Sequence, residues 1–186
     1  MKSTLAAIFM TVGLLATGSA MAISAEDAVE LRTASTEALI TFKKDTSGAE
    51  NMLNNAKGFL VCPEITKGGF IVGVETGLCE LQVGGETVDY YRLISAKFGW
   101  LAGLSWYSTI LVFNEQGALD NFRTSDTKME VGADLSVSIV EVGASGTVNT
   151  TNLRGPISGF IFSEKGLMAD ASLKGATLNK LELEVD

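Results

Sequence analysis

The chain has 186 residues, of which 22 are acidic and 14 basic, so its formal net charge at pH 7 is −8. It contains no histidine, which excludes Ser-His-Asp and Cys-His catalysis and the usual zinc sites. An acidic chain also gains nothing from a nucleic-acid backbone, which attracts clustered lysine and arginine. We therefore expect no catalytic residues, no metal, no cofactor and no nucleic-acid partner.

Residues 1–22 have the pattern of a secretory signal peptide. Lys2 gives the positive start, Leu5–Leu15 the apolar run, and Ala20-Met21-Ala22 the small-x-small cleavage site. A membrane anchor is the alternative, but the run is far shorter than the ~20 residues of a spanning helix. We expect cleavage after Ala22 and a periplasmic or secreted protein that is one charge unit more negative without Lys2.

Residues 24–44 are expected to form an amphipathic helix that begins with a capping box, Ser24 with Asp27. Its apolar stripe either packs on the core of the domain, which we favour, or lies on a membrane surface. The stripe recurs at three- and four-residue steps: Leu31, Ala34, Ala38, Leu39 and Phe42.

A second capping pattern, Ser47 with Glu50, predicts a short helix at 48–57 that ends at Gly58. Beyond it, short apolar runs and period-two alternation predict strands separated by glycine turns. The first strand, 59–62, is expected to stop at Pro63, which has no N–H for a ladder, and a turn is expected at 65–69. Further strands are predicted at 70–74, 78–83, 86–95, 97–106, 108–113, 127–132, 135–139, 145–150, 157–163, 168–173 and 177–184.

A later helix is predicted at 114–123, with Asn114 as its N-cap and with Leu119 and Phe122 pointing inward. The many short strands favour an α+β fold in which N-terminal helices pack on a strongly curved, barrel-like antiparallel sheet. No proline-rich linker or clean repeat divides the chain. We therefore expect one domain over residues 23–186.

Residues 56–85 concentrate three apolar runs, seven glycines and both cysteines. The order AKGFLV-x-PEITKGGFIVG-x-E-x-G in this stretch resembles the SYLF-domain family. The resemblance continues in one collinear order through residues 84–91, 107–113, 132–137 and 160–169. It implies a lipid-binding module of the kind found in bacterial envelopes and in eukaryotic membrane-trafficking and actin-regulating proteins.

Two features depart from that family. Cys62 stands where an aromatic residue is common, so a redox feature here is particular to this chain. Family members that bind phosphoinositides use a basic amphipathic N-terminal segment, whereas residues 24–30 are acidic. Phosphoinositide specificity is therefore not carried over.

Cys62 and Cys79 fall on neighbouring predicted strands. In an exported protein such a pair can oxidise, and the closed loop stabilises the fold by on the order of 3 kcal/mol. Two buried free thiols are the alternative. We favour the disulfide.

The candidate lipid contacts combine aromatic side chains, which suit apolar pockets and membrane interfaces, with cations for a lipid phosphate. Core packing of the aromatics and solvation of the lysines are the alternatives. The pair Glu64 and Glu75 is a poor acid/base dyad, since the sequence defines neither its separation nor a raised pKa. The candidates are Lys57, Lys67, Arg92, Lys97, Trp100, Trp106 and Tyr107.

Three functions follow, in order of preference. The first is a non-catalytic module that binds phospholipid or a membrane surface, and a deep apolar cavity with basic residues at its mouth would favour it. The second is a structural or protein-interaction module of the envelope, which an exposed apolar patch on one sheet face would favour. A hydrolase comes third and requires clustered carboxylates in a cleft.

Overall fold

The computed structural model describes residues 21–69, 71–98, 103–125, 128–141, 155–166 and 172–184. In these ranges three helices and a nine-stranded sheet form a mixed α+β fold. The predictions for the signal segment, for strand 145–150 and for most of strand 168–173 lie outside the described residues. The elements are β1 (Ala22–Ile23), α1 (Ala25–Asp45), α2 (Ala49–Asn55), β2 (Gly58–Gly69), β3 (Val72–Val83), β4 (Glu86–Phe98), β5 (Gly103–Phe113), α3 (Gln116–Thr124), β6 (Lys128–Glu130), β7 (Val137–Glu141), β8 (Ile157–Gly166) and β9 (Thr177–Leu183).

The strand order is β1-β9-β4-β3-β2-β5-β8-β7, with β6 also paired to β9. Strands β1 and β7 stand at the two ends of this order and, within the described part of the chain, do not pair with each other. The sheet is therefore open, and the expectation of a barrel-like sheet is not confirmed. It is also not purely antiparallel, because β1 runs parallel to β9 and β7 parallel to β8.

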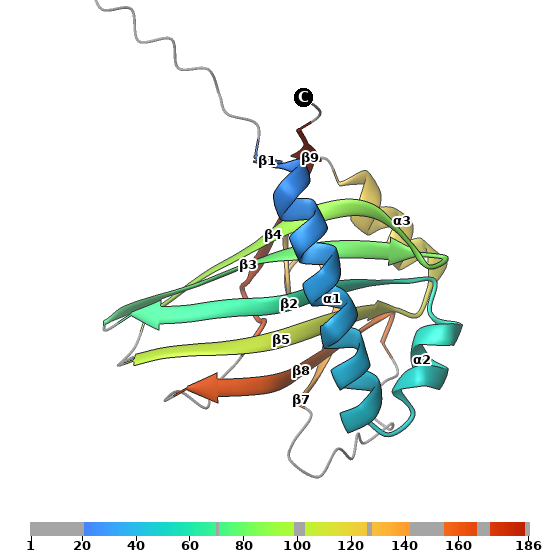
Figure 1. The fold of residues 1–186 in the computed structure, drawn as a ribbon, viewed down its shortest axis with the longest axis horizontal. Coiled ribbons are helices and arrows are strands. Elements are labelled where there is room, and N and C mark those ends of the chain that lie inside the picture. Colours follow the sequence, from blue (N-terminus) through green and yellow to red (C-terminus); the bar gives the residue numbers. More distant parts are fainter. Residues whose placement is uncertain are drawn as a thin grey trace, which may run out of the picture.

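Helix α1 begins where the sequence predicts. The Ser24 hydroxyl accepts a hydrogen bond from the Asp27 backbone N–H at 3.1 Å, which satisfies one donor of the first turn. The helix crosses one face of β2 and β3, here called the outer face (Figure 1). Phe42 packs between Phe160 and Phe162, with ring centroids 5.2 Å apart in both pairs. The buried residues of α1 are Ala28, Leu31, Ser35, Ala38 and Phe42.

Helix α2 starts one residue later than a Ser47 cap requires. Its N-cap is Gly48, with φ +80° and no capping side chain, so the predicted Ser47–Glu50 capping box is wrong. Gly58 does not end the helix either, since it is the first residue of β2. A Cβ at Gly58 would lie 3.0 Å from the carbonyl oxygen of Gln82, so close approach between β2 and β3 explains this glycine.

Strand β2 runs unbroken through Pro63, so both the predicted stop there and the turn at 65–69 are wrong. The pairing of β2 shifts register on both sides between residues 62 and 65, which marks a bulge. Cys62 and Ile65 both belong to the core on the opposite, inner face, so the bulge inserts one extra residue between them. Proline is tolerated at this point because a bulge leaves one residue out of the ladder.

Strands predicted as separate pieces elsewhere also merge. Residues 72–83 form one strand, and β5 unites parts of the predicted strands 97–106 and 108–113. Helix α3 buries Leu119 and Phe122, as predicted, but Glu115 is its N-cap. The Asn114 amide instead donates to the carbonyl of Gly155 and to the hydroxyl of Ser158, both at 2.9 Å.

The inner face holds the larger core. Phe122 of α3 lies 4.6 Å from the ring of Tyr91 and 5.0 Å from that of Phe113, between ring centroids. Cys62 and Cys79 form a disulfide that joins β2 to β3 within this core, and both are fully buried. The predicted disulfide is confirmed. The sheet thus separates a helix-covered outer face from an inner core.

Candidate functional site

Three of the sequence candidates meet at one buried carboxylate on the inner face, and we call them, with Glu75, the Glu75 cluster. The Lys97 ammonium lies 2.9 Å from Glu75 Oε1, and that of Lys67 lies 3.7 Å from the same oxygen. The Tyr107 hydroxyl donates to Glu75 Oε2 at 3.0 Å. Register explains the meeting, because Lys67 of β2 stands directly opposite Glu75 of β3.

This cluster is internal to the fold. Glu75 is only 1% exposed and Lys67 is equally buried. Burial raises the pKa of Tyr107 well above its usual value, and the negative charge of Glu75 raises that pKa further. Lys97 also donates to the Ser172 carbonyl at 2.6 Å, which ties residues 172–176 to the inner side of the sheet. The two lysines therefore hold the fold together at this end of the sheet.

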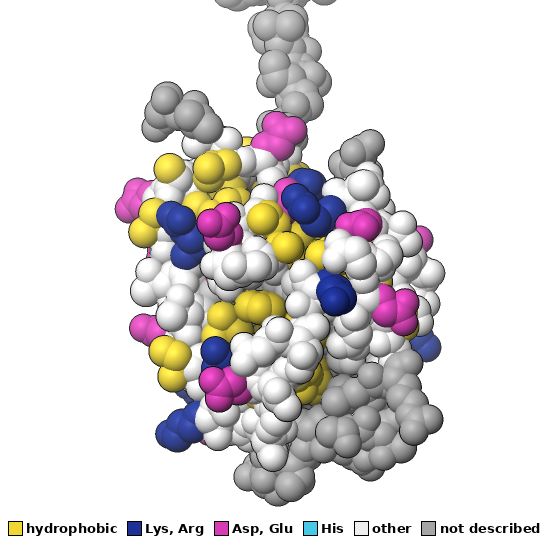
Figure 2. Space-filling view, turned by 90° about the vertical axis from the view of Figure 1, so that its right-hand side faces the viewer, with side chains coloured by type: hydrophobic (Ala, Val, Ile, Leu, Met, Phe, Trp, Pro, Cys, Tyr) yellow, Lys and Arg dark blue, Asp and Glu magenta, His cyan; other side chains and the backbone are white. Residues whose placement is uncertain are grey.

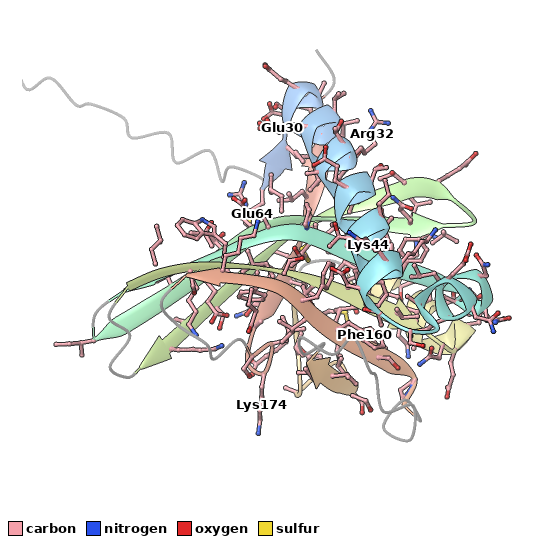
Figure 3. All side chains as sticks on the ribbon, turned by 60° about the horizontal axis from the view of Figure 1, so that its bottom comes forward. Glu30, Arg32, Lys44, Glu64, Phe160 and Lys174 are labelled. Atoms are coloured by element: carbon pink, nitrogen blue, oxygen red, sulfur yellow. A yellow bond between two sulfur atoms is a disulfide. The ribbon has the colours of Figure 1, made fainter. Side chains whose placement is uncertain are left out.

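Glu64 and Glu75 are not brought together. Glu64 is exposed, whereas Glu75 is buried in the Glu75 cluster on the inner face. Figure 3 shows Glu64 close to the N-terminal half of α1, with Lys174 on the other side of the sheet. Sequence reasoning missed the partners of Glu75 because a bulge of one residue decides which side of the sheet Lys67 faces.

Trp106 lies on the outer face in an exposed apolar surface, which we call the outer patch. Its side chain is 37% exposed and its backbone pairs with that of Thr66. The patch lies toward the ends of β3, β4 and β5 that extend beyond α1, on the left of Figure 1. Because none of the three described helices covers this part of the sheet, apolar side chains there face solvent. The outer patch consists of Val72, Val74, Ile94, Leu104 and Trp106.

The strand ends that carry the outer patch contain more basic than acidic residues, although the whole chain is acidic. Residues 65–69, 71–76, 92–98 and 103–107 contain Lys67, Arg92, Lys97 and the buried Glu75. The end of β8 that pairs with β5 adds Lys165 and the exposed Glu164. The opposite end of the molecule, where α2 and α3 lie, shows acidic and basic side chains interspersed (Figure 2). A negatively charged surface is thus opposed less at the patch than the net charge suggests.

The remaining candidates do not join one site. Arg92 is half-buried on the outer face, opposite Leu78 and near the patch. Lys57 is exposed in the connection from α2 to β2, at the other end of β2. Trp100 lies outside the described residues.

Two surface pockets formed by described residues flank α1, one lined by polar and apolar side chains alike and the other mostly by polar ones. One, of about 330 Å³, lies between α1 and the bulge of β2 and includes Asp27, Glu30 and Glu64. Another, of about 490 Å³, lies over β3 and β4. Neither is the deep apolar cavity that would hold a lipid chain. No helix of the described chain is long and apolar enough to cross a membrane.

The sequence model of the Ysc84 family, described as Las17-binding protein actin regulator, matches residues 94–182. The match runs from within β4 to β9 and contains Trp106 and Tyr107. No curated protein matches the chain. This match to the Ysc84 (SYLF) family confirms the family that the sequence motifs predicted.

Proposed function

We propose that this protein is an exported, non-catalytic module that docks onto a phospholipid surface of the cell envelope through the outer patch. The observation that carries the proposal is the patch itself, five large apolar side chains exposed on one face of the sheet. Trp106 is among them, and tryptophan suits a boundary between apolar and wet surroundings. The match to the family supports a lipid ligand.

Burial of this patch supplies the driving force. Fully burying one large apolar side chain contributes about 1.5–3 kcal/mol, and partly exposed side chains contribute a fraction of that. The net negative charge opposes binding to an anionic bilayer, but salt screens it beyond about 8 Å. Arg92 lies on the outer face near the patch, whereas Lys97 is held by Glu75 on the inner face. Binding is therefore expected to be weak, local and dependent on apolar contact.

Export follows the signal pattern and accords with the N-terminal packing. Ile23, the first residue after the proposed cleavage site, is buried, and its carbonyl accepts a hydrogen bond from the Glu184 N–H at 2.9 Å. Removal of residues 1–22 would cost the Ala22 half of β1 and the hydrogen bond from the Glu182 N–H to the Met21 carbonyl, but it would leave the Ile23 contact in place. The mass of the protein recovered outside the cytoplasm should correspond to a chain beginning at Ile23, and a full-length chain in the inner membrane would contradict export.

Vesicle co-sedimentation tests the docking surface. Val74→Ser should weaken binding to vesicles of mixed phospholipids by several-fold, because it removes an exposed apolar side chain from the patch. Val88→Ser is the matched control, since Val88 is a 37% exposed valine at the far end of β4. Equal binding of both variants and of the unchanged protein, all folded, would reject the patch as the docking surface.

A protein partner is the second candidate, because an exposed apolar patch also fits an interaction surface. The family description names a protein, Las17, as a binding target of its members. If no vesicle composition retains the protein, and Val74→Ser releases a bound envelope protein that Val88→Ser retains, the protein-interaction function replaces the lipid one.

A further inference from the structure

A second site lies on the outer face, in the pocket of about 490 Å³ between α1 and the strands β3 and β4. We call it the Glu80 pocket. No residue of the outer patch lines it, so it is separate from the proposed docking surface. Its lining includes Arg32 and Thr36 of α1 and Glu80, Glu86, Thr87 and Tyr90 of the sheet.

Glu80 is the unusual member of this lining. It is 0% exposed, and its carboxylate accepts hydrogen bonds from the Gln82 amide at 2.6 Å and from the Thr87 hydroxyl at 3.0 Å. Both donors are neutral, and no ion pair formed by the described residues includes Glu80. An ionised carboxylate taken out of water without a cation is strongly disfavoured. A cation that enters the pocket would remove this penalty.

We propose that the Glu80 pocket binds an organic ammonium group, with Glu80 as the principal acceptor. The pocket volume matches a small molecule, and the aromatic ring of Tyr90 is suited to contact with an alkylated cation. Glu86 adds a second carboxylate to the lining, and Thr36 adds a hydroxyl acceptor. The lining therefore carries two negative charges against the single positive charge of Arg32.

Other ligand classes fit this pocket less well. Calcium takes six to eight oxygen ligands, whereas two carboxylates line the pocket and the described residues contain no cluster of three metal-binding side chains. An acyl chain is excluded by the charged lining. Arg32 leaves room for an anionic group on the same ligand, so an aminoalkyl phosphate is compatible, either free in solution or as a lipid headgroup.

Amide chemical-shift titration of the folded protein tests the proposal. Ethanolamine and phosphoethanolamine are the probes, and sodium chloride at matched ionic strength is the reference. We expect shifts at Gln82, Gly85 and Thr87, and an affinity about tenfold lower in Glu80→Gln. The control is Glu50→Gln, which removes the same charge from an exposed position on α2. Vesicles with and without phosphatidylethanolamine, compared with free phosphoethanolamine, distinguish the headgroup from a soluble amine.

Three results would overturn the proposal. They are no pocket shift with either amine, equal weakening by Glu80→Gln and Glu50→Gln, and binding that appears only after Arg32→Met. The last would mean that Arg32 itself neutralises Glu80. Because Glu86 is exposed, Glu86→Gln gives a second variant whose weaker binding does not depend on a buried substitution. Val74→Ser should leave amine binding unchanged, so failure of this site and failure of the docking surface are distinguishable.

Discussion

Strand β3 carries two glutamates five positions apart, one on each face of the sheet, and both are hidden from water. Glu75, on the inner face, faces two ammonium groups and a tyrosine hydroxyl. Glu80, on the outer face beside α1, accepts hydrogen bonds from an amide and a hydroxyl of the described residues. Among the residues that the structure describes, the same residue type at nearly the same burial thus pairs with two ammonium groups at Glu75 and with none at Glu80. A buried carboxylate whose charge is fully paired has a structural role. One whose charge is unpaired, beside a pocket, indicates a ligand site.

Substitution of Glu75 should give the largest effect. Removing one member of a buried ion pair is strongly destabilising, typically by about 3–5 kcal/mol. In Glu75→Gln the amide oxygen can still accept from the lysines and the N–H₂ can donate to the Tyr107 hydroxyl, but Lys67 and Lys97 lose the negative charge of the carboxylate that they share. Denaturant unfolding of the variant should show a loss of this size. A loss below about 1 kcal/mol would mean that the inner cluster is solvated and that the two glutamates do not differ.

The disulfide between the two glutamate positions should come next. Cys79 lies four residues after Glu75 and one before Glu80, and its partner Cys62 is 17 residues away in sequence. Closing a loop of this length stabilises a fold by about 3 kcal/mol in the chain-entropy model. Replacing both cysteines by alanine should lower the free energy of unfolding accordingly. An unchanged midpoint, in a protein whose thiols are confirmed as oxidised, would contradict this estimate.

Alkaline pH should lower the free energy of unfolding by a smaller amount. Burial raises the pKa of Tyr107, with Glu75 adding to the effect, and burial likewise raises that of Tyr91. An unfolded tyrosine ionises near pH 10, while the buried ones stay neutral. The folded state then holds more protons than the unfolded state, so stability is complete below pH 10 and falls above it.

The expected slope is up to about 1.4 kcal/mol per pH unit for each tyrosine. Unfolding curves between neutral pH and pH 11 measure this slope, and Tyr107→Phe should remove the part of the slope that Tyr107 contributes. A stability that is flat through this range would show that both hydroxyls ionise freely in the folded protein.

Local sequence patterns predicted much of this fold and its disulfide. The Ser24 cap, the inward face of α3 and the Cys62–Cys79 disulfide follow from spacing that acts over a few residues. The family motifs led to the match over residues 94–182. The open sheet edges were missed, because closure depends on how β1 and β7 lie in space, which alternation within a strand does not encode.

The site was predicted only in part, for the same reason. Lys67, Lys97 and Tyr107 were grouped from sequence as lipid contacts, yet they meet at Glu75 inside the fold. One inserted residue at Pro63 reverses the facing of the rest of β2, and a proline alone does not distinguish a bulge from a strand end. The sequence around Glu80 does not indicate that this residue is buried, because the helix that covers it, α1, lies far from it in the sequence.

Glu80→Gln should have the smallest effect on stability, and it tests the comparison most directly. The Gln82 amide can turn to present its oxygen, and the Thr87 hydroxyl can accept as well as donate. Both neighbours can therefore satisfy the new amide, whereas substitution of Glu75 leaves two ammonium groups without the charge of their shared carboxylate. We expect the free energy of unfolding without ligand to change by less than about 1 kcal/mol, or to rise as an unpaired buried charge is removed. The same denaturant series as for Glu75→Gln, with Glu50→Gln as the surface reference, measures the difference. A loss as large as that of Glu75→Gln would mean that Glu80 is already compensated in the folded protein, and the Glu80 pocket would then have no need of a cation.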